Sequence, residues 1–261
     1  MNNIVYLDAD FVIKTSQLTI DSSTLFDRIL ELPYTFKITN KVLAEIKRGL
    51  QTKLVGLIAA GKISVIRTSD CINDLAKFYN IATVENIVLS SLKEISEDVT
   101  ESEDLYKTYF SKLEVHIAIA DDLSLFSNEL DHAIASVPNG KSIGEIVTLL
   151  NMSLTNRLQN TKVISLLSHD SAARKSVLSL HENINSYDCH TCLHLLKENC
   201  ILDYAEAKKY ASAWLRTFPK NTLVKIIENK RARGVDPHEF VRIMFCGSKY
   251  SILRNGILKK E

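Results

Sequence analysis

Four acidic residues occupy positions in this sequence from which their carboxylates could act together. They are Asp8 in IVYLDADFVI, Glu45 in NKVLAEI, Glu145 in SIGEIVTLL and Asp170 in VISLLSHDSAAR. Each one ends an apolar run of strand length or lies in the first turns of an expected helix. Carboxylates gathered from distant segments are typical ligands of a hard divalent cation such as Mg²⁺ or Mn²⁺. The sequence therefore raises the hypothesis of a metal centre built from four acids.

Apolar runs of strand length alternate with segments of helical period along the chain. The expected strands cover residues 3–8, 35–38, 62–66 and 162–167, and the expected helices cover about 21–31, 40–46, a stretch ending at Ala60, 142–150 and the residues after 170. This alternation predicts an α/β fold with a central parallel sheet and helices on both faces. Because ligands bind beyond the carboxyl ends of parallel strands, we expect Asp8 and Asp170 to converge there. The two glutamates, at helix starts, are expected to join them.

Each of these carboxylates also has a purely structural interpretation. Asp8 could cap a following turn, Asp170 could be the N-cap of the next helix, Glu145 fits a capping box with Ser142, and Glu45 could pair with Lys41 or Arg48 at helical spacing. A capping carboxylate at the end of a strand also points at the edge of the sheet. The structural and the catalytic interpretations are therefore compatible.

The composition is that of an ordinary globular protein. The chain has 261 residues, of which 46% are hydrophobic and 24% charged, which allows one large domain or two small ones. The N-terminal residues lack a basic region followed by an apolar run, and no stretch of about 18 uncharged apolar residues occurs, so we expect neither a secretory signal nor a membrane span. Five cysteines, an odd number, argue against a disulfide framework and for a cytoplasmic protein with reduced thiols.

The net charge of +1 hides an uneven distribution of charged residues. Residues 85–131 hold 12 acids and 3 bases, and residues 220–261 hold 10 bases and 4 acids. The acidic stretch belongs to a region, 71–137, with helical period throughout. Further helices are expected at 188–199, 203–216, 221–231 and 236–245. The basic segment could grip RNA, with Tyr250 stacking on a base, or pack as a terminal helix, and both charged stretches could be solvated helix faces.

The four acids and their surroundings resemble those of the PIN-domain nuclease family. The matching segments are Leu7-Asp8-Ala9-Asp10 after the first strand, Glu45 in VLAEI, Gly144-Glu145 opening a helix, and Ser168-His169-Asp170-Ser171-Ala172-Ala173-Arg174 after the last strand. The resemblance covers roughly residues 1–70 and 138–216. It implies a nuclease domain at 1–216 with a helical insertion at about 71–137, followed by a basic helical extension at 217–261. Asp10 stands where the family usually has Asn or Ser, and the insertion is longer than usual.

The resemblance implies a metal-dependent endoribonuclease that hydrolyses RNA, such as tRNA or mRNA, with Mg²⁺ or Mn²⁺ as cofactor. Asp8 is expected to bridge the metal ions, with Glu145 and Asp170 beside it. Asp10 would orient a metal-bound water, and Glu45 would act as a base or as an outer metal ligand. Because acids packed this closely repel one another, some of their pKa values should rise in the absence of metal.

Three neighbours of Asp170 are candidates for supporting roles. Ser168 could touch a phosphate or hold Asp170, and Arg174 could hold a phosphate or pair with an acid. His169 could shuttle a proton or act as a neutral hydrogen-bonding group. The family resemblance also implies a role as a toxin, a defence nuclease or an RNA-processing enzyme. The partners considered are RNA, an inhibitory antitoxin-like protein and a second copy of the chain, with no membrane.

Two other functions remain open at the level of the sequence. The chain could be a PIN-like binding or scaffold protein with little or no cleavage, although such a protein would be expected to have lost some of the four acids. It could also be a metal-dependent phosphohydrolase of a doubly wound fold, but no Gly-rich phosphate loop stands out. A weaker zinc candidate is formed by Cys189, His190, Cys192 and His194, with Cys200 beyond them. The same segment is also compatible with a helix whose cysteines face the core.

Overall fold

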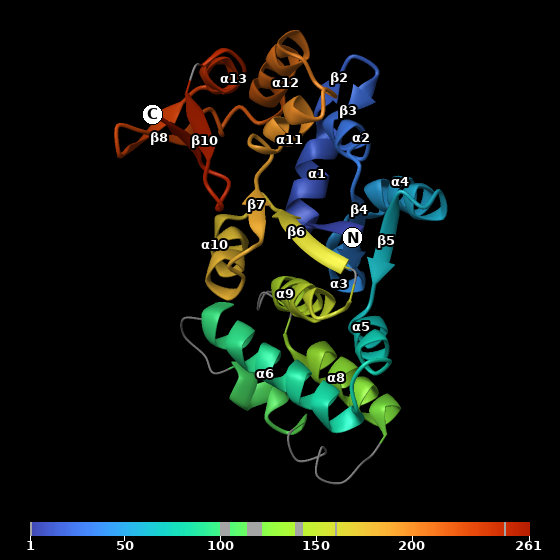
Figure 1. Cartoon of the computed structure of the whole chain (residues 1–261). Helices are drawn as coiled ribbons and strands as arrows, with labels where there is room; N and C mark the ends of the chain where they lie inside the picture. The colour runs from blue at the N-terminus through green and yellow to red at the C-terminus, as the bar shows by residue number, and fades with distance from the viewer. Residues whose placement is uncertain (1, 100–104, 114–121, 139–142, 160, 248) are drawn as a thin grey trace.

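A five-stranded parallel sheet forms the centre of the molecule (Figure 1). The computed structural model describes residues 2–99, 105–113, 122–138, 143–159, 161–247 and 249–261. The sheet has the order β5 (Ile63–Ile66), β4 (Thr35–Thr39), β1 (Asn2–Leu7), β6 (Thr161–Leu167) and β7 (Asn185–Tyr187). Each neighbouring pair is parallel, so the predicted α/β fold is confirmed. Strand order reverses between β1 and β6, which makes their carboxyl ends the switch point of the sheet.

Helices cover both faces of the sheet, as the sequence predicts (Figure 1). β1 shows why: Val5 and Leu7 lie in one core cluster, whereas Ile4 and Tyr6 lie in the other. The first cluster receives side chains from α1 (Ala9–Gln17), α2 (Leu25–Ile29), α3 (Asn40–Glu45), α4 (Arg48–Ala59), α11 (Cys192–Glu198), α12 (Tyr204–Thr217) and α13 (Pro237–Cys246). The second receives them from α5 (Thr68–Leu75), α6 (Ile81–Val99), the π-helix η1 (Tyr106–Phe110), α8 (Leu123–Ser136), α9 (Ile143–Asn156) and α10 (Ser171–Leu180).

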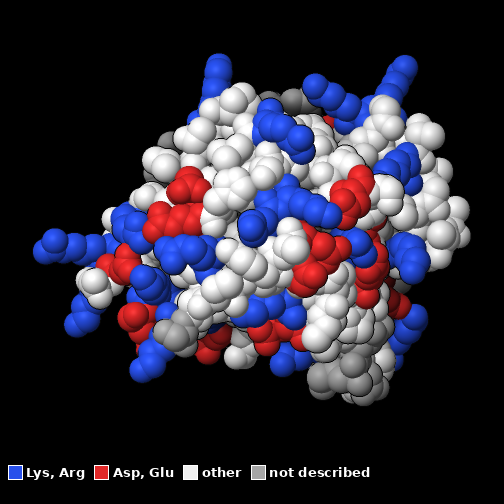
Figure 2. All heavy atoms as spheres, turned by 90° about the horizontal axis from the view of Figure 1, so that it is seen from above, with Lys and Arg blue, Asp and Glu red and all other residues white. Residues whose placement is uncertain are grey.

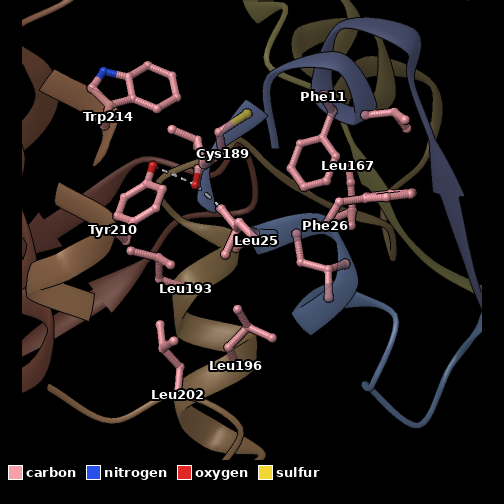
Figure 3. Close-up of a cluster of buried hydrophobic side chains, with 14 of the residues drawn as sticks. Phe11, Leu25, Phe26, Leu167, Cys189, Leu193, Leu196, Leu202, Tyr210 and Trp214 are labelled. Carbon is pink, nitrogen blue, oxygen red and sulfur yellow. Dashed lines mark hydrogen bonds between the residues drawn. The ribbon is translucent and has the colours of Figure 1, made fainter. Parts of the chain in front are cut away.

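Aromatic side chains of α12 join the N-terminal and C-terminal parts of the chain (Figure 3). Trp214 and Tyr210 are fully buried among side chains of α1, α2 and α11. The Tyr210 hydroxyl donates a hydrogen bond to the Cys189 carbonyl at 2.9 Å, which satisfies its only polar group. Cys189 and Cys192, considered above as zinc ligands, have fully buried side chains in this apolar cluster.

The C-terminal extension is the main point on which the sequence-based prediction is wrong. Residues 221–231 were expected to be a helix, but they contain β8 (Val224–Glu228), which pairs antiparallel with β9 (Arg231–Val235). Val224 and Ile226 are buried while Lys225 is exposed, a period of two that the charged residues around it obscure. Asn229 and Lys230 have φ of 50° and 64°, which suits the tight turn between the strands. Of the two helices expected here, only 236–245 is confirmed, as α13.

β10 (Tyr250–Ile252) and β11 (Leu258–Lys260) complete this C-terminal sheet in the order β10-β11-β8-β9. Two basic residues of this sheet, Lys260 and Arg233, form ion pairs with acids of the same C-terminal extension. Glu228 accepts from both Lys260 and Arg233 at 2.6 Å, and Arg233 also binds Glu239 at 2.9 Å. In the view from above, Lys and Arg side chains alternate with carboxylates (Figure 2). The described part of the basic segment 220–261 therefore contains four short strands and the helix α13, and it is not a uniformly basic surface on that side.

Two further element boundaries differ from the prediction. Helix α2 begins after Thr24, which forms a capping box with Asp27, whereas Asp21 has a φ of 56° in the turn between β2 (Thr19–Ile20) and β3 (Ser23–Thr24). Helix α11 begins only at Cys192, because β7 and a turn precede it. The helical character expected for 71–137 is confirmed in the described part of that region, by α5, α6, η1 and α8. The expected turn at Pro138-Asn139-Gly140 and the Ser142 cap fall at least partly outside the described residues.

None of the described helices is long and apolar enough to span a membrane.

Candidate functional site

A cleft of about 440 Å³ opens at the switch point of the sheet. Its lining includes every acid that the sequence singled out, namely Asp8, Asp10, Glu45, Glu145 and Asp170. Asp8 follows β1 and Asp170 follows β6, whereas the two glutamates come from the end of α3 and the first turn of α9. The carboxyl ends of adjacent parallel strands necessarily share one edge of the sheet. The predicted convergence of these acids therefore follows directly from the strand order.

A single buried hydroxyl connects the two strand-end acids. The Ser168 hydroxyl donates to Asp8 Oδ2 at 2.7 Å and accepts from the Asp170 backbone N–H at 3.1 Å. Ser168 is fully buried, so its hydroxyl positions the two acids, which is the second of the two roles considered above. Both acids are also N-caps: Asp8 Oδ1 accepts from Ala9 N–H, and Asp170 Oδ1 accepts from Ala172 N–H. Their structural and site positions coincide.

Asp10 adds a further charge to the same edge of the cleft. One of its oxygens pairs with Lys14, one turn later in α1, at 3.1 Å. The other accepts from the His169 backbone N–H at 3.3 Å. Asp10 thereby links α1 to the segment that carries Asp170. Asp10 therefore lines the cleft beside Asp8 and Asp170.

The site opposes the ionisation of three of its acids, Asp8, Glu45 and Glu145. Burial raises the pKa of Asp8, and nearby Asp10 and Asp170 raise it further against the hydrogen bond from Ser168. Burial likewise raises the pKa of Glu145 to about 7; the Ser176 side chain partly offsets this rise, and Asp170 and Asp8 add to it. At the rim of the cleft, partial desolvation and then Asp8 raise the pKa of Glu45. A cation among these groups would reverse each of these effects.

Several observations show that the residues fit a hard divalent cation. The cleft offers carboxylate oxygens from five residues, the ligand type that Mg²⁺ and Mn²⁺ prefer. Glu145 Oε1 is buried without a hydrogen-bond partner, which is costly unless something else binds it. Among the described residues, no three His, Cys, Asp or Glu side chains already stand together as a metal-holding group. The carboxylates that line the cleft and the unpartnered Glu145 oxygen therefore carry the fit to a cation.

Arg174 does not line the acidic cleft. Its guanidinium donates to the Ser168 carbonyl at 3.0 Å and to the Asn255 carbonyl at 3.2 Å, and it lies 3.9 Å from Asp188. These contacts hold the segment after β6 against the loop between β10 and β11. Of the two predicted roles, the structure therefore places Arg174 near an acid, although one that no sequence spacing indicated.

The remaining walls of the cleft come from residues to which the sequence analysis gave no role in the site, although Ala9, Gly144 and Ala173 stand in the motifs it quoted. They are Ala9, Ile143, Gly144, Thr148, Leu149, Leu166 and Ala173. Gly144 has a specific role, because a Cβ there would overlap Glu45 Oε1. The glycine lets α9 approach the end of α3 closely enough for two glutamates to share the cleft. The Gly-Glu pair was noted in the sequence, but the neighbour that requires the glycine is about a hundred residues away and gives no local signal.

Comparisons of this chain with protein-family models, with curated proteins and with solved structures found no match. The fold and the geometry of the cleft are therefore the basis for a functional assignment.

Proposed function

We propose that this protein is a metal-dependent endoribonuclease whose active site is the acidic cleft. The observation that carries the proposal is the convergence of Asp8, Glu45, Glu145 and Asp170, from four distant segments, at the switch point of a parallel sheet. The resemblance of the same four segments to PIN-domain nucleases supports this assignment. The raised pKa values of three of these acids support it as well, because perturbed carboxylates cluster at functional sites.

In this proposal Asp8, Glu145 and Asp170 hold Mg²⁺ or Mn²⁺, with Asp10 beside them. When bound, the cation polarises the phosphodiester, acidifies a water and stabilises the leaving oxygen. Asp10 orients the attacking water, and Glu45, at the rim, is placed to accept its proton. Ser168 keeps Asp8 and Asp170 at a constant separation. Water attacks the phosphorus and gives a proton to Glu45, the ester P–O bond to the leaving strand breaks, and the leaving oxygen takes a proton from solvent.

We place this activity in the cytoplasm, where the five free cysteines remain reduced. Within the resembled family, a chain of this kind acts as a toxin or as a defence or processing nuclease. An inhibitory protein that covers the cleft is the partner this role requires. The alternative is a PIN-like binding or scaffold module with little or no cleavage, which would use the helical region at about 71–137 as its interaction surface.

The test is a cleavage assay on tRNA, mRNA and single-stranded DNA with Mg²⁺, Mn²⁺ or EDTA. We expect metal-dependent cleavage of RNA that falls roughly 100-fold or more in Asp8→Asn, because the site then lacks a charge on its central ligand. Asp131→Asn, on the exposed side of α8, is the matched control and should cleave like the wild type. Circular dichroism checks that both variants fold. Cleavage that survives in EDTA and in Asp8→Asn would rule out this mechanism, and RNA binding without cleavage would favour the binding module.

A further inference from the structure

A second pocket, of about 400 Å³, lies behind the segment that carries Asp170. His169 lines this second pocket, whereas the next residue, Asp170, lines the acidic cleft. Two consecutive residues of one segment thus line the two sites. The other walls come from the end of β7, from α12 and from the residues that lead into β8. They include Arg174, Asp188, His190, Trp214, Lys220, Asn221, Thr222 and Lys225. We call it the basic pocket.

Positive charge exceeds negative charge in the basic pocket. Burial acts to raise the pKa of Asp188, but His190, Arg174 and a backbone hydrogen bond from Thr191 hold it below its usual range. The ionised Asp188 therefore offsets the charge of Arg174, which lies 3.9 Å away. Burial lowers the pKa of His190 to about 4, so this ring is neutral near pH 7.

Lys220 and Lys225 remain as surplus charges at the mouth of the pocket. Both are exposed, and neither has an acidic partner within ion-pair distance in the described part of the chain. This sets them apart from Lys260 and Arg233 of the same extension, which bind Glu228. Two unneutralised ammonium groups beside neutral donors are suited to an anion.

The segment that presents the lysines is held in a defined conformation. Trp214 Nε1 donates to the Asn221 carbonyl at 2.8 Å, and the Asn221 N–H donates to the Phe218 carbonyl at 2.9 Å. The ring centroids of Trp214 and Phe218 are 4.6 Å apart, so the turn packs against a pair of aromatic side chains. His169 Nδ1 is buried in the structure without a hydrogen-bond partner. The pocket thus combines two lysines, carried on or next to a turn whose backbone is held in place, with an unsatisfied polar atom.

We propose that the basic pocket binds a backbone phosphate of the RNA strand, next to the phosphodiester held in the acidic cleft. The inference rests on the proposed nuclease function. A polynucleotide has phosphates on both sides of the scissile one and can occupy both sites at once. A mononucleotide or inorganic phosphate has a single phosphate group and cannot. The basic pocket therefore makes the enzyme selective for a strand.

Binding of RNA to an uncleaving protein tests the proposal. A labelled single-stranded RNA of roughly eight nucleotides is titrated into Asp8→Asn protein at several salt concentrations, followed by anisotropy. Adding Lys220→Gln and Lys225→Gln should weaken binding roughly tenfold and flatten the slope of log K against log salt by about 0.7 for each lost phosphate contact. The matched control adds Lys62→Gln and Lys162→Gln, two exposed lysines at the amino ends of β5 and β6, and should leave both quantities unchanged.

The chain's single tryptophan gives a second readout, because Trp214 lines the pocket. RNA should alter its emission in the Asp8→Asn protein but not after the Lys220 and Lys225 changes. Equal affinity and salt slope in the two lysine pairs would overturn the proposal. The proposal would also be overturned if the two lysine substitutions weakened the binding of inorganic phosphate but left the affinity for RNA unchanged. The nuclease proposal can fail separately. If RNA binds through Lys220 and Lys225 but the wild-type protein never cleaves it, the proposed catalysis is wrong and the proposed phosphate site stands.

Discussion

The half-buried carboxyl group of Glu145 is difficult to ionise, because burial and the nearby Asp170 and Asp8 raise its pKa. Its pKa is about 7 in the folded chain against an ordinary value of 4.5. At a pH between these two pKa values, the Glu145 carboxyl group is ionised in the unfolded chain and still protonated in the folded chain. Raising the pH through this window therefore favours unfolding, and the loss of stability is complete above about pH 7. At neutral pH this residue destabilises the metal-free protein.

We therefore predict that Glu145→Gln stabilises the metal-free protein at pH 8 by about 1–3 kcal/mol, or a few degrees in Tm, since each pKa unit corresponds to about 1.4 kcal/mol. The advantage should vanish near pH 4. Thermal melts of both proteins between these pH values measure the difference. The control is Glu182→Gln, an exposed acid in the turn after α10, which should change little at any pH.

Saturating Mg²⁺ should reverse the order at pH 8, because the wild type gains binding free energy that the Gln variant has lost. A stability difference that does not vary with pH would show that Glu145 ionises normally. A Tm insensitive to Mg²⁺ in both proteins would argue against Glu145 as a metal ligand.

At the scale of elements, the contact between α3 and α9 decides whether two glutamates can share the cleft. Gly144 leaves no side chain where Glu45 Oε1 lies. We predict that Gly144→Ala folds normally but displaces the flexible Glu45 carboxylate, weakening Mg²⁺ binding and RNA cleavage by about 10-fold to 100-fold. Isothermal titration and the cleavage assay measure these effects.

Gly56→Ala in α4 is the matched control, because a Cβ there meets nothing within 4 Å. It should raise stability by up to about 1 kcal/mol, since alanine has the higher helix propensity, and leave cleavage unchanged. Wild-type metal affinity together with wild-type cleavage in Gly144→Ala would show that Glu45 has no part in the site.

The elements also show where local pattern is a sound guide and where it is not. The run KVISLL predicts β6 because a strand buried on both faces is apolar throughout. β7 is only three residues long, Asn-Ser-Tyr, and exists through its pairing with β6. β8 was taken for a helix because adjacent Ile226 and Ile227 suit either period. Its partner β9 and the left-handed turn between them resolve that ambiguity.

At the scale of the whole molecule, the C-terminal sheet shares a core with the central sheet. Val224, Ile226, Phe240 and Met244 belong to the same cluster as Phe11 and Trp214. The ring of Phe240 lies 5.8 Å from that of His190, which in turn lies 4.2 Å from Trp214. A shared core of this kind predicts that the two sheets unfold together.

We predict that Phe240→Ala lowers the stability of the entire chain by about 3–5 kcal/mol, because it leaves a cavity in this shared core. Tryptophan fluorescence and far-ultraviolet circular dichroism should report the same transition, shifted to lower temperature. Leu223→Ala is the control from the same segment: its side chain is 69% exposed, so the change should stay within about 0.5 kcal/mol. A fluorescence transition that precedes the loss of helix would mean that the C-terminal sheet melts as a separate unit.

By itself, the sequence determined the features that depend on neighbouring residues. Apolar runs placed β1 and β6, and the acids directly after them, Asp8 and Asp170, were predicted to meet because parallel strands end at a common edge. The tertiary structure decided which distant groups those residues contact. Ser168 bridges the two acids, Gly144 makes room for Glu45, Arg174 turns to Asn255, and Lys220 comes to lie near His169. The physical reason is that backbone conformation and burial follow from local periodicity, whereas the partners of a side chain depend on which segments the packed core brings together.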